Sequence, residues 1–216
     1  MKKNLLRIGP LLLLASVAHA GVIVACTSNC PQGNEQNILF TTNQSGTLDF
    51  GFTNQSHTQV DFSSTTDILN TPSKGQAMLT AADGDINNLS ISVPNKTFAD
   101  FIFDAEMGQL SKSGSLTLTA YALTSNNIMQ IVTLGTFSLG TGSNFFTIVA
   151  NNQWMITQII INSSNGISGL GFQTLKQPRI SVISGTIPEP ASLPLLGAGL
   201  FSFFCLLKRT PHQRQV

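Results

Sequence analysis

The alternation of polar and apolar side chains is the feature that most restricts the fold of this chain. Residues 115–122 alternate until the run ends in small residues, and residues 89–93 and 100–104 follow the same period. Successive side chains of a strand point to opposite faces, so this period describes strands with one buried face. The middle of the chain shows no amphipathic helical stripe with capping residues.

Further β-rich segments fall at residues 37–42, 47–53, 58–63, 76–81, 129–137, 145–150, 154–162 and 178–184. Residues typical of turns separate many of them, at 43–46, 83–84, 140–142 and 165–166. Many short strands at this spacing predict an all-β fold, in which two antiparallel sheets form a jelly-roll-like β-sandwich. Residues 21–187 are long enough for one such domain.

The few charged residues are unevenly placed. Of the 11 Lys and Arg residues, three lie in the first seven residues and three in the last nine. Without these six and without Glu189, the middle of the chain has five basic and nine acidic residues, so its net charge is near −4. Nucleic-acid binding needs clustered basic side chains that neutralise phosphates. The middle is therefore a poor candidate for a nucleic-acid-binding domain.

The N-terminus has the three parts of a secretion signal. Residues 1–7 are basic, residues 8–17 are apolar, and Ala18-His19-Ala20 supplies the small residues that precede a cleavage site. The apolar run is too short to be a permanent membrane anchor. We predict that residues 1–20 are a signal peptide, which signal peptidase removes between Ala20 and Gly21. Residues 23–26 leave a second site open, at which Cys26 would be lipidated.

The last segment, residues 188–216, begins with Pro188-Glu189-Pro190. An apolar run at about 191–207 is just long enough to cross a thin membrane as a transmembrane helix, and Lys208 and Arg209 follow as a basic stop on the cytoplasmic side. These features resemble the PEP-CTERM sorting signal of Gram-negative bacteria. The resemblance implies that an exosortase recognises the Pro-Glu-Pro segment and removes the tail during delivery to the surface. An uncut C-terminal anchor is the alternative.

Parts of the middle also resemble the β-sandwich ectodomains that often precede PEP-CTERM tails. The stretches that carry this resemblance are residues 75–77, 82–84, 88–89, 144–147, 161–163 and 177–181. The resemblance implies an extracellular β-domain associated with exopolysaccharide-producing bacteria. It brings no catalytic residues with it.

Cys26 and Cys30 are the two cysteines of the middle, because Cys205 lies in the tail. Outside the inner membrane a pair of thiols usually forms a disulfide. The residues between and after them favour the turn that would bring the two sulfurs together, so we predict a disulfide. Their spacing differs from that of a Cys-x-x-Cys redox motif.

The middle offers few groups for catalysis or metal binding. His57 is its only histidine and has no nucleophile motif beside it, and a zinc site would need more His and Cys ligands. Residues 83–87 carry oxygens at alternate positions, but Asn88 and Pro94 stand where an EF-hand loop needs Gly and Glu. A β-turn is favoured there over surface calcium. We predict no cofactor, no metal site and no catalytic site.

Two alternatives to a structural role stay open. Sugar binding by stacking would need Trp154 and Tyr121 exposed on one concave face, although both positions also fit a core or its rim. A surface hydrolase would need paired carboxylates in a cleft, from among Asp100, Asp104 and Glu106, although these three also fit a solvated strand end.

Two export signals around a strand-rich domain predict a non-enzymatic exported protein. We expect it in the cell envelope, on the surface or outside the cell, in a structural or adhesive role linked to exopolysaccharide or biofilm. Its predicted partners are signal peptidase, exosortase and exopolysaccharide, with the membrane contacted through the C-terminal helix.

Overall fold

The computed structural model describes residues 23–27, 30, 32–72, 77–107, 114–151, 154–164 and 171–186. The predicted signal peptide (residues 1–20), the cleavage site Ala20-Gly21, the Pro188-Glu189-Pro190 motif, the apolar run 191–207 and the basic stop Lys208-Arg209 all lie outside these residues. Within the described ranges, the chain forms no helix of the length and hydrophobicity that membrane crossing requires.

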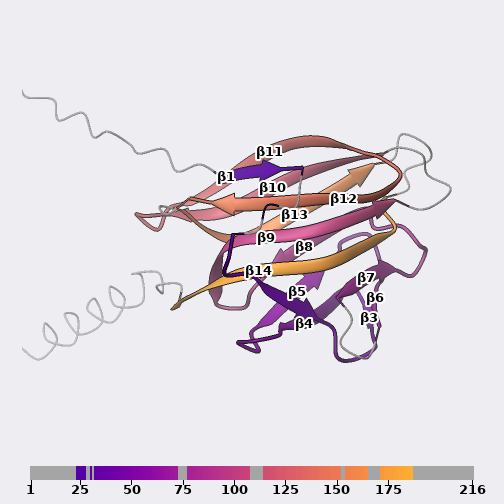
Figure 1. Cartoon of the computed structure of the whole chain (residues 1–216), viewed down its shortest axis with the longest axis horizontal. Coiled ribbons are helices and arrows are strands. Elements are labelled where there is room, and N and C mark those ends of the chain that lie inside the picture. Colours follow the sequence, from indigo (N-terminus) through magenta and orange to yellow (C-terminus); the bar gives the residue numbers. More distant parts are fainter. Residues whose placement is uncertain are drawn as a thin grey trace, which may run out of the picture.

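Fourteen strands make up the described part of the chain (Figure 1). They are β1 (Ile23–Cys26), β2 (Gln36–Leu39), β3 (Gln44–Gly46), β4 (Leu48–Thr53), β5 (Gln59–Ser63), β6 (Leu69–Thr71), β7 (Met78–Ala81), β8 (Asn88–Ser92), β9 (Lys96–Met107), β10 (Gly114–Thr124), β11 (Met129–Leu139), β12 (Gly142–Ala150), β13 (Trp154–Ser164) and β14 (Thr174–Thr186).

The strands lie in two layers, and every pairing between the named strands is antiparallel (Figure 1). The β9 layer runs β1-β12-β9-β14 and continues through β7, β6 and β3. The β13 layer runs β11-β10-β13-β8-β5-β4. Strand β2 pairs with both β14 and β4, so it joins the two layers along one side.

Phenylalanine and aliphatic side chains fill the space between the layers. The rings of Phe101 and Phe103 on β9 stack with centroids 5.4 Å apart, and Phe103 stacks on Phe146 of β12 at 5.2 Å. The β13 layer opposes them with buried side chains that include Leu118 on β10 and Ile159 on β13. Each such side chain contributes about 1.5–3 kcal/mol when it leaves water, so this core fixes which face of each long strand points inward.

The structure confirms an all-β, sandwich-like fold, and the long alternating segments are strands. The turn predicted at residues 43–46 is wrong in part, because Gln44–Gly46 forms strand β3 and pairs with β6. The side chain of Gln44 explains this. Its Oε1 accepts the backbone N–H of Phe50 (2.9 Å) and its Nε2 donates to the carbonyl of Phe50 (3.0 Å), so the amide holds β3 beside β4. The short strands β1 and β6 were not predicted.

Asp49 is an uncompensated polar group in the core. It lies on the inward face of β4, opposite Phe62 of β5, and is 1% exposed. Among the described residues, neither of its carboxylate oxygens has a hydrogen-bond partner. Burial raises the pKa of Asp49 from 3.8 to about 6, because the charged form loses its hydration without a replacement.

We expect Asp49→Asn to remove a pH-dependent penalty on folding. The folded state holds the proton more tightly than the unfolded state, so the wild type loses stability as the pH rises from about 4 to about 6. Two pKa units correspond to about 3 kcal/mol. This is the largest increase in the free energy of unfolding that the variant should gain over the wild type as the pH rises. Urea unfolding at pH 4, 5, 6 and 7 measures it. A difference between the two proteins that stays constant with pH would contradict this account.

Candidate functional site

The outward face of β9 carries the three carboxylates considered for a hydrolase. Asp100, Asp104 and Glu106 are separated by even numbers of residues, so their side chains leave the strand on the same side. Asp100 and Asp104 are four residues apart, which is about 13 Å along a strand. Because glycosidases hold their two carboxyl groups within about 9.5 Å of each other, Asp104 and Glu106 are the better-placed pair on this strand.

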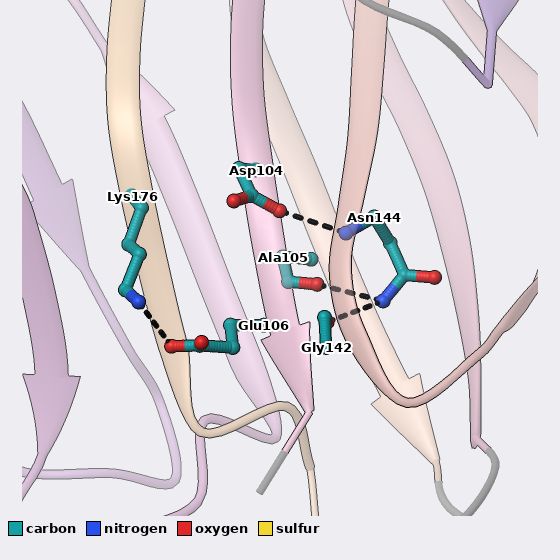
Figure 2. A network of polar contacts seen from close by, with 6 residues as sticks. All are labelled: Asp104, Ala105, Glu106, Gly142, Asn144 and Lys176. Carbon is teal, nitrogen blue, oxygen red and sulfur yellow. Dashed lines mark hydrogen bonds and ion pairs between the residues drawn. The ribbon is translucent and has the colours of Figure 1, made fainter.

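Asp104 and Glu106 turn toward different neighbouring strands (Figure 2). Asp104 Oδ1 accepts a hydrogen bond from the backbone N–H of Asn144 on β12 at 2.7 Å. Glu106 Oε2 lies 2.5 Å from Lys176 Nζ on β14. The two groups diverge and tie β9 to the strand on either side. This arrangement fits a structural role better than paired acid–base chemistry.

Asn144 organises the turn between β11 and β12 (Figure 2). Its Nδ2 donates to the carbonyls of Ala105 (3.0 Å) and Gly142 (2.9 Å), and its Oδ1 accepts the backbone N–H of Gly140 (2.8 Å). One amide therefore satisfies backbone groups of the turn and of β9 at the same time. The polar residues at this end of the β9 layer serve to fix strand ends.

Asp100 lies on the outward face of β9, near enough to the N-terminal strap, which we define as the described residues between β1 and β2, to sense the charge of Glu35. Asp100 is 3% exposed. Burial raises its pKa, and the negative charge of Glu35 in the strap adds to this effect. A second contact holds the strap where it crosses β12, because the backbone N–H of Cys30 donates to Thr147 Oγ1 at 3.1 Å. The strap thus covers part of the outward face of the β9 layer.

The structure brings the two predicted disulfide partners together. The Sγ atoms of Cys26, at the end of β1, and Cys30, in the strap, lie 2.7 Å apart. Cys26 also pairs in register with Thr147, the residue whose hydroxyl accepts from Cys30. The disulfide itself stays a prediction. Its position would fasten the beginning of the strap to the edge of the β9 layer.

A turn occupies the loop that was considered for calcium. The backbone N–H of Gly84 donates to the carbonyl of Ala81 at 3.1 Å, and Gly84 has a φ of 92°, which favours glycine. In the part of the chain that the structure describes, no three His, Cys, Asp or Glu side chains gather in a way that could hold a metal ion.

The carboxylate that organises this region is Asp67, which the sequence did not single out. It is 3% exposed and accepts the backbone N–H groups of Asn87 (2.9 Å) and Asn88 (3.1 Å), as well as the Asn87 side-chain amide (3.0 Å). The hydroxyls of Ser64 and Thr66 also donate to it. Burial alone would raise the pKa of Asp67, but these hydrogen bonds outweigh burial and lower it.

Trp154 and Tyr121 lie on opposite sides of the β10–β13 pair. Trp154 is half-buried and packs against the core. Its register partner Thr124 lies two residues from buried Ala122, so Trp154 is on the inward side of the pair. Tyr121 is half-buried on the outward side, between Gln158 and Ile131. The two rings therefore do not form one stacking platform. His57 is exposed in the β4–β5 turn.

The outward face of the β13 layer is a grid of uncharged side chains that spans β8, β13, β10 and β11. The strand register places them in three rows, and none of the twelve is fully buried. The rows are Asn88-Asn162-Thr117-Thr136, Ser90-Ile160-Thr119-Thr133 and Ser92-Gln158-Tyr121-Ile131. We call this the uncharged face.

Hydrogen bonds within the uncharged face order its polar groups. The hydroxyls of Thr117 and Thr136 lie 2.9 Å apart, and Gln158 Nε2 donates to Ser90 Oγ at 2.6 Å. Asn88 Nδ2 donates to Asn162 Oδ1 at 2.7 Å. These pairs link neighbouring strands and leave further donor and acceptor capacity toward solvent. The sequence contained a signal for this surface, because no charged residue occurs from 113 to 175.

A scan against protein families matches residues 186–209 to the PEP-CTERM protein-sorting motif. The chain carries a PEP-CTERM sorting motif. The motif indicates a protein that is exported and sorted to the cell envelope or surface. It covers the predicted Pro188-Glu189-Pro190 segment, the apolar run and the basic stop. A search of curated proteins found no significant match.

Several solved carbohydrate-binding structures resemble the fold distantly. A family 29 carbohydrate-binding module is 11% identical, with a TM-score of 0.30 over 79% of this chain and 94% of its own. A family 29 module from Piromyces equi is 9% identical, with a TM-score of 0.28 over 75% and 89%. The xylan-binding domain from CBM 22 is 12% identical, with a TM-score of 0.25 over 78% and 98%.

We expect Asp67→Asn to lower the free energy of unfolding by about 3 kcal/mol at pH 7, because the variant loses charge-assisted hydrogen bonds and leaves buried donors unpaired. The pKa of Asp67 is lowered on folding, so this contribution is present above the unfolded value of 3.8 and is lost as the pH falls through the folded value. Urea unfolding at several pH values measures the loss, and exposed Asp83→Asn is the matched control. An equal effect of the two substitutions at pH 7 would contradict the assignment.

Proposed function

We propose that this chain is an exported, non-enzymatic protein with an adhesive role in the extracellular matrix, in which the uncharged face lies against a neutral polysaccharide. The observation that carries the proposal is the grid of hydroxyl, amide and apolar side chains on the β13 layer. The sorting motif supports a place at the envelope or surface, where such polymers occur.

The chemistry of the uncharged face suits a polymer of hydroxyl groups. Serine and threonine hydroxyls and the amides of Asn and Gln each donate and accept hydrogen bonds, as sugar hydroxyls do. No ionic group in the grid has to be dehydrated when a neutral polymer approaches. Each contact contributes only about 1 kcal/mol, so adhesion would come from many contacts along the polymer.

A carbohydrate-binding module for the cell's own exopolysaccharide is the second candidate. Tyr121 favours it, because its ring lies within the uncharged face beside Gln158. Stacking on this one ring would give the module a defined sugar subsite. The two candidates differ in how much of the affinity depends on Tyr121.

The absence of enzymatic activity is part of the proposal. The carboxylates of Asp104 and Glu106 are held by Asn144 and Lys176 on opposite sides of β9, and Asp100 is buried. A hydrolase would instead need two of these groups directed at one bond of the substrate. The contacts thus support strand fixation as their role.

We expect Gln158→Ala to weaken retention of the protein in gels that contain the host's exopolysaccharide by about fivefold, because one hydrogen-bonding group in the middle of the face is lost. Affinity electrophoresis measures the retention. Gln173→Ala is the matched control, since Gln173 is exposed and lies outside the uncharged face. Equal retention of both variants would contradict the proposed surface. Complete loss of retention in Tyr121→Ala would favour the module.

The processing that we propose has a mass signature. Signal peptidase and exosortase would leave a chain that begins at Gly21 and ends near Pro188, and a Cys26–Cys30 disulfide would lower its mass by two hydrogens. Intact masses from the envelope and the culture supernatant of the native host measure all three events. A chain that retains Val216 would mean that the tail is a plain membrane anchor.

A further inference from the structure

Strand β11 forms a long outer edge of the β13 layer. It pairs with β10 from Met129 to Leu139, and no other strand pairs with it among the residues that the structure describes. Strand β1 of the facing layer approaches β11 but pairs only with β12 (Figure 1). One set of backbone N–H and C=O groups along β11 therefore points away from the sheet, and such groups are a template for another strand.

The features that usually protect an edge strand are scarce on β11. Its eleven residues contain no proline and no charged side chain. Ile131 is 63% exposed and Met129 is 50% exposed, and the preceding Ile128 adds to this aliphatic patch at 55%. A single register shift near Gly135 is the one bulge in its pairing with β10. By comparison, the outermost strands β1 and β3 of the β9 layer have four and three residues.

We propose that a second copy of this chain docks along β11, so that two β11 strands pair antiparallel and one sheet continues through both copies. Antiparallel pairing of a strand with itself is compatible with twofold symmetry, in which both copies contribute the same surface. Two neutral strands meet without repulsion, and the exposed aliphatic side chains of each copy lose water against the partner's strand.

The size of the contact is sufficient for a stable dimer. Eleven residues at about 3.4 Å each give an edge about 37 Å long and about 10 Å wide, and the four residues of β1 in the facing layer add about 13 Å of the same width. Each copy would bury about 500 Å², or about 1,000 Å² in total, which is the size that a specific interface should reach. The proposal does not depend on polysaccharide binding.

The test is native mass spectrometry of the full chain released from detergent micelles. We expect a dimer for the wild type and at least a tenfold weaker dimer for Ile131→Lys, because each copy would bring a charged side chain against the partner's strand, where it loses water. The matched control is Ile68→Lys, which places the same side chain at a position 53% exposed outside β11 and should stay dimeric. Circular dichroism confirms that both variants fold. If Ile131→Lys does not fold, Thr133→Lys replaces it, since Thr133 is also exposed on β11.

Hydrogen exchange of the wild type provides a second measurement. The amides of β11 should become more protected as the protein concentration rises, whereas those of the short strand β3 should not. A monomeric wild type would overturn the proposal. So would an equally strong dimer of Ile131→Lys and Ile68→Lys, which would place the contact elsewhere. Protection of β11 that does not vary with concentration would mean that another part of the same chain covers this edge.

Discussion

The burial of one face of every long strand is the constraint on which the rest of the structure depends. Phe101, Phe103 and Phe146 stack within the β9 layer, and the aliphatic residues of β10 and β13 pack against them. Because side chains alternate along a strand, this core also decides which side chains point outward. The outward faces are then free to differ, and here they do. The outward face of the β9 layer carries carboxylates and the strap, whereas that of the β13 layer carries no charge over four strands.

The two outward faces differ because the charges are concentrated in one part of the chain. The carboxylates of β9 and Lys176 of β14 lie on the β9 layer, where they connect neighbouring strands. The charge-free stretch from 113 to 175 supplies β10, β11 and β13, which form one end of the β13 layer. The same stretch also supplies β12, whose outward Thr147 lies under the strap. Polar residues thus connect strands on the outward face of the β9 layer, and they remain available for contacts on the outward face of the β13 layer.

Period-two alternation was sufficient to predict the class of fold and most of the long strands. It could not predict strand order, because β9 lies between β12 and β14, which are distant from it in sequence. It also missed β3, whose pairing depends on the side chain of Gln44 rather than on a hydrophobic period. Asp67 escaped notice because its partners Asn87 and Asn88 lie about 20 residues away in sequence and meet it only after folding. Its neighbours Ser64 and Thr66 were the one local sign of a turn built around a carboxylate.

The two proposed surfaces are geometrically compatible. A twofold axis between two antiparallel strands of one sheet is perpendicular to that sheet, so directly opposed residues point to the same side. Pairing of β11 with its copy would therefore join two uncharged faces into one continuous surface, with Thr133 and Thr136 near the junction rather than at a rim. A polymer chain that contacts one copy would meet the second at high effective concentration. Hydrogen bonds that are each too weak for adhesion would then act together along the polymer. This is possible because the uncharged face of the β13 layer extends to the open edge at β11.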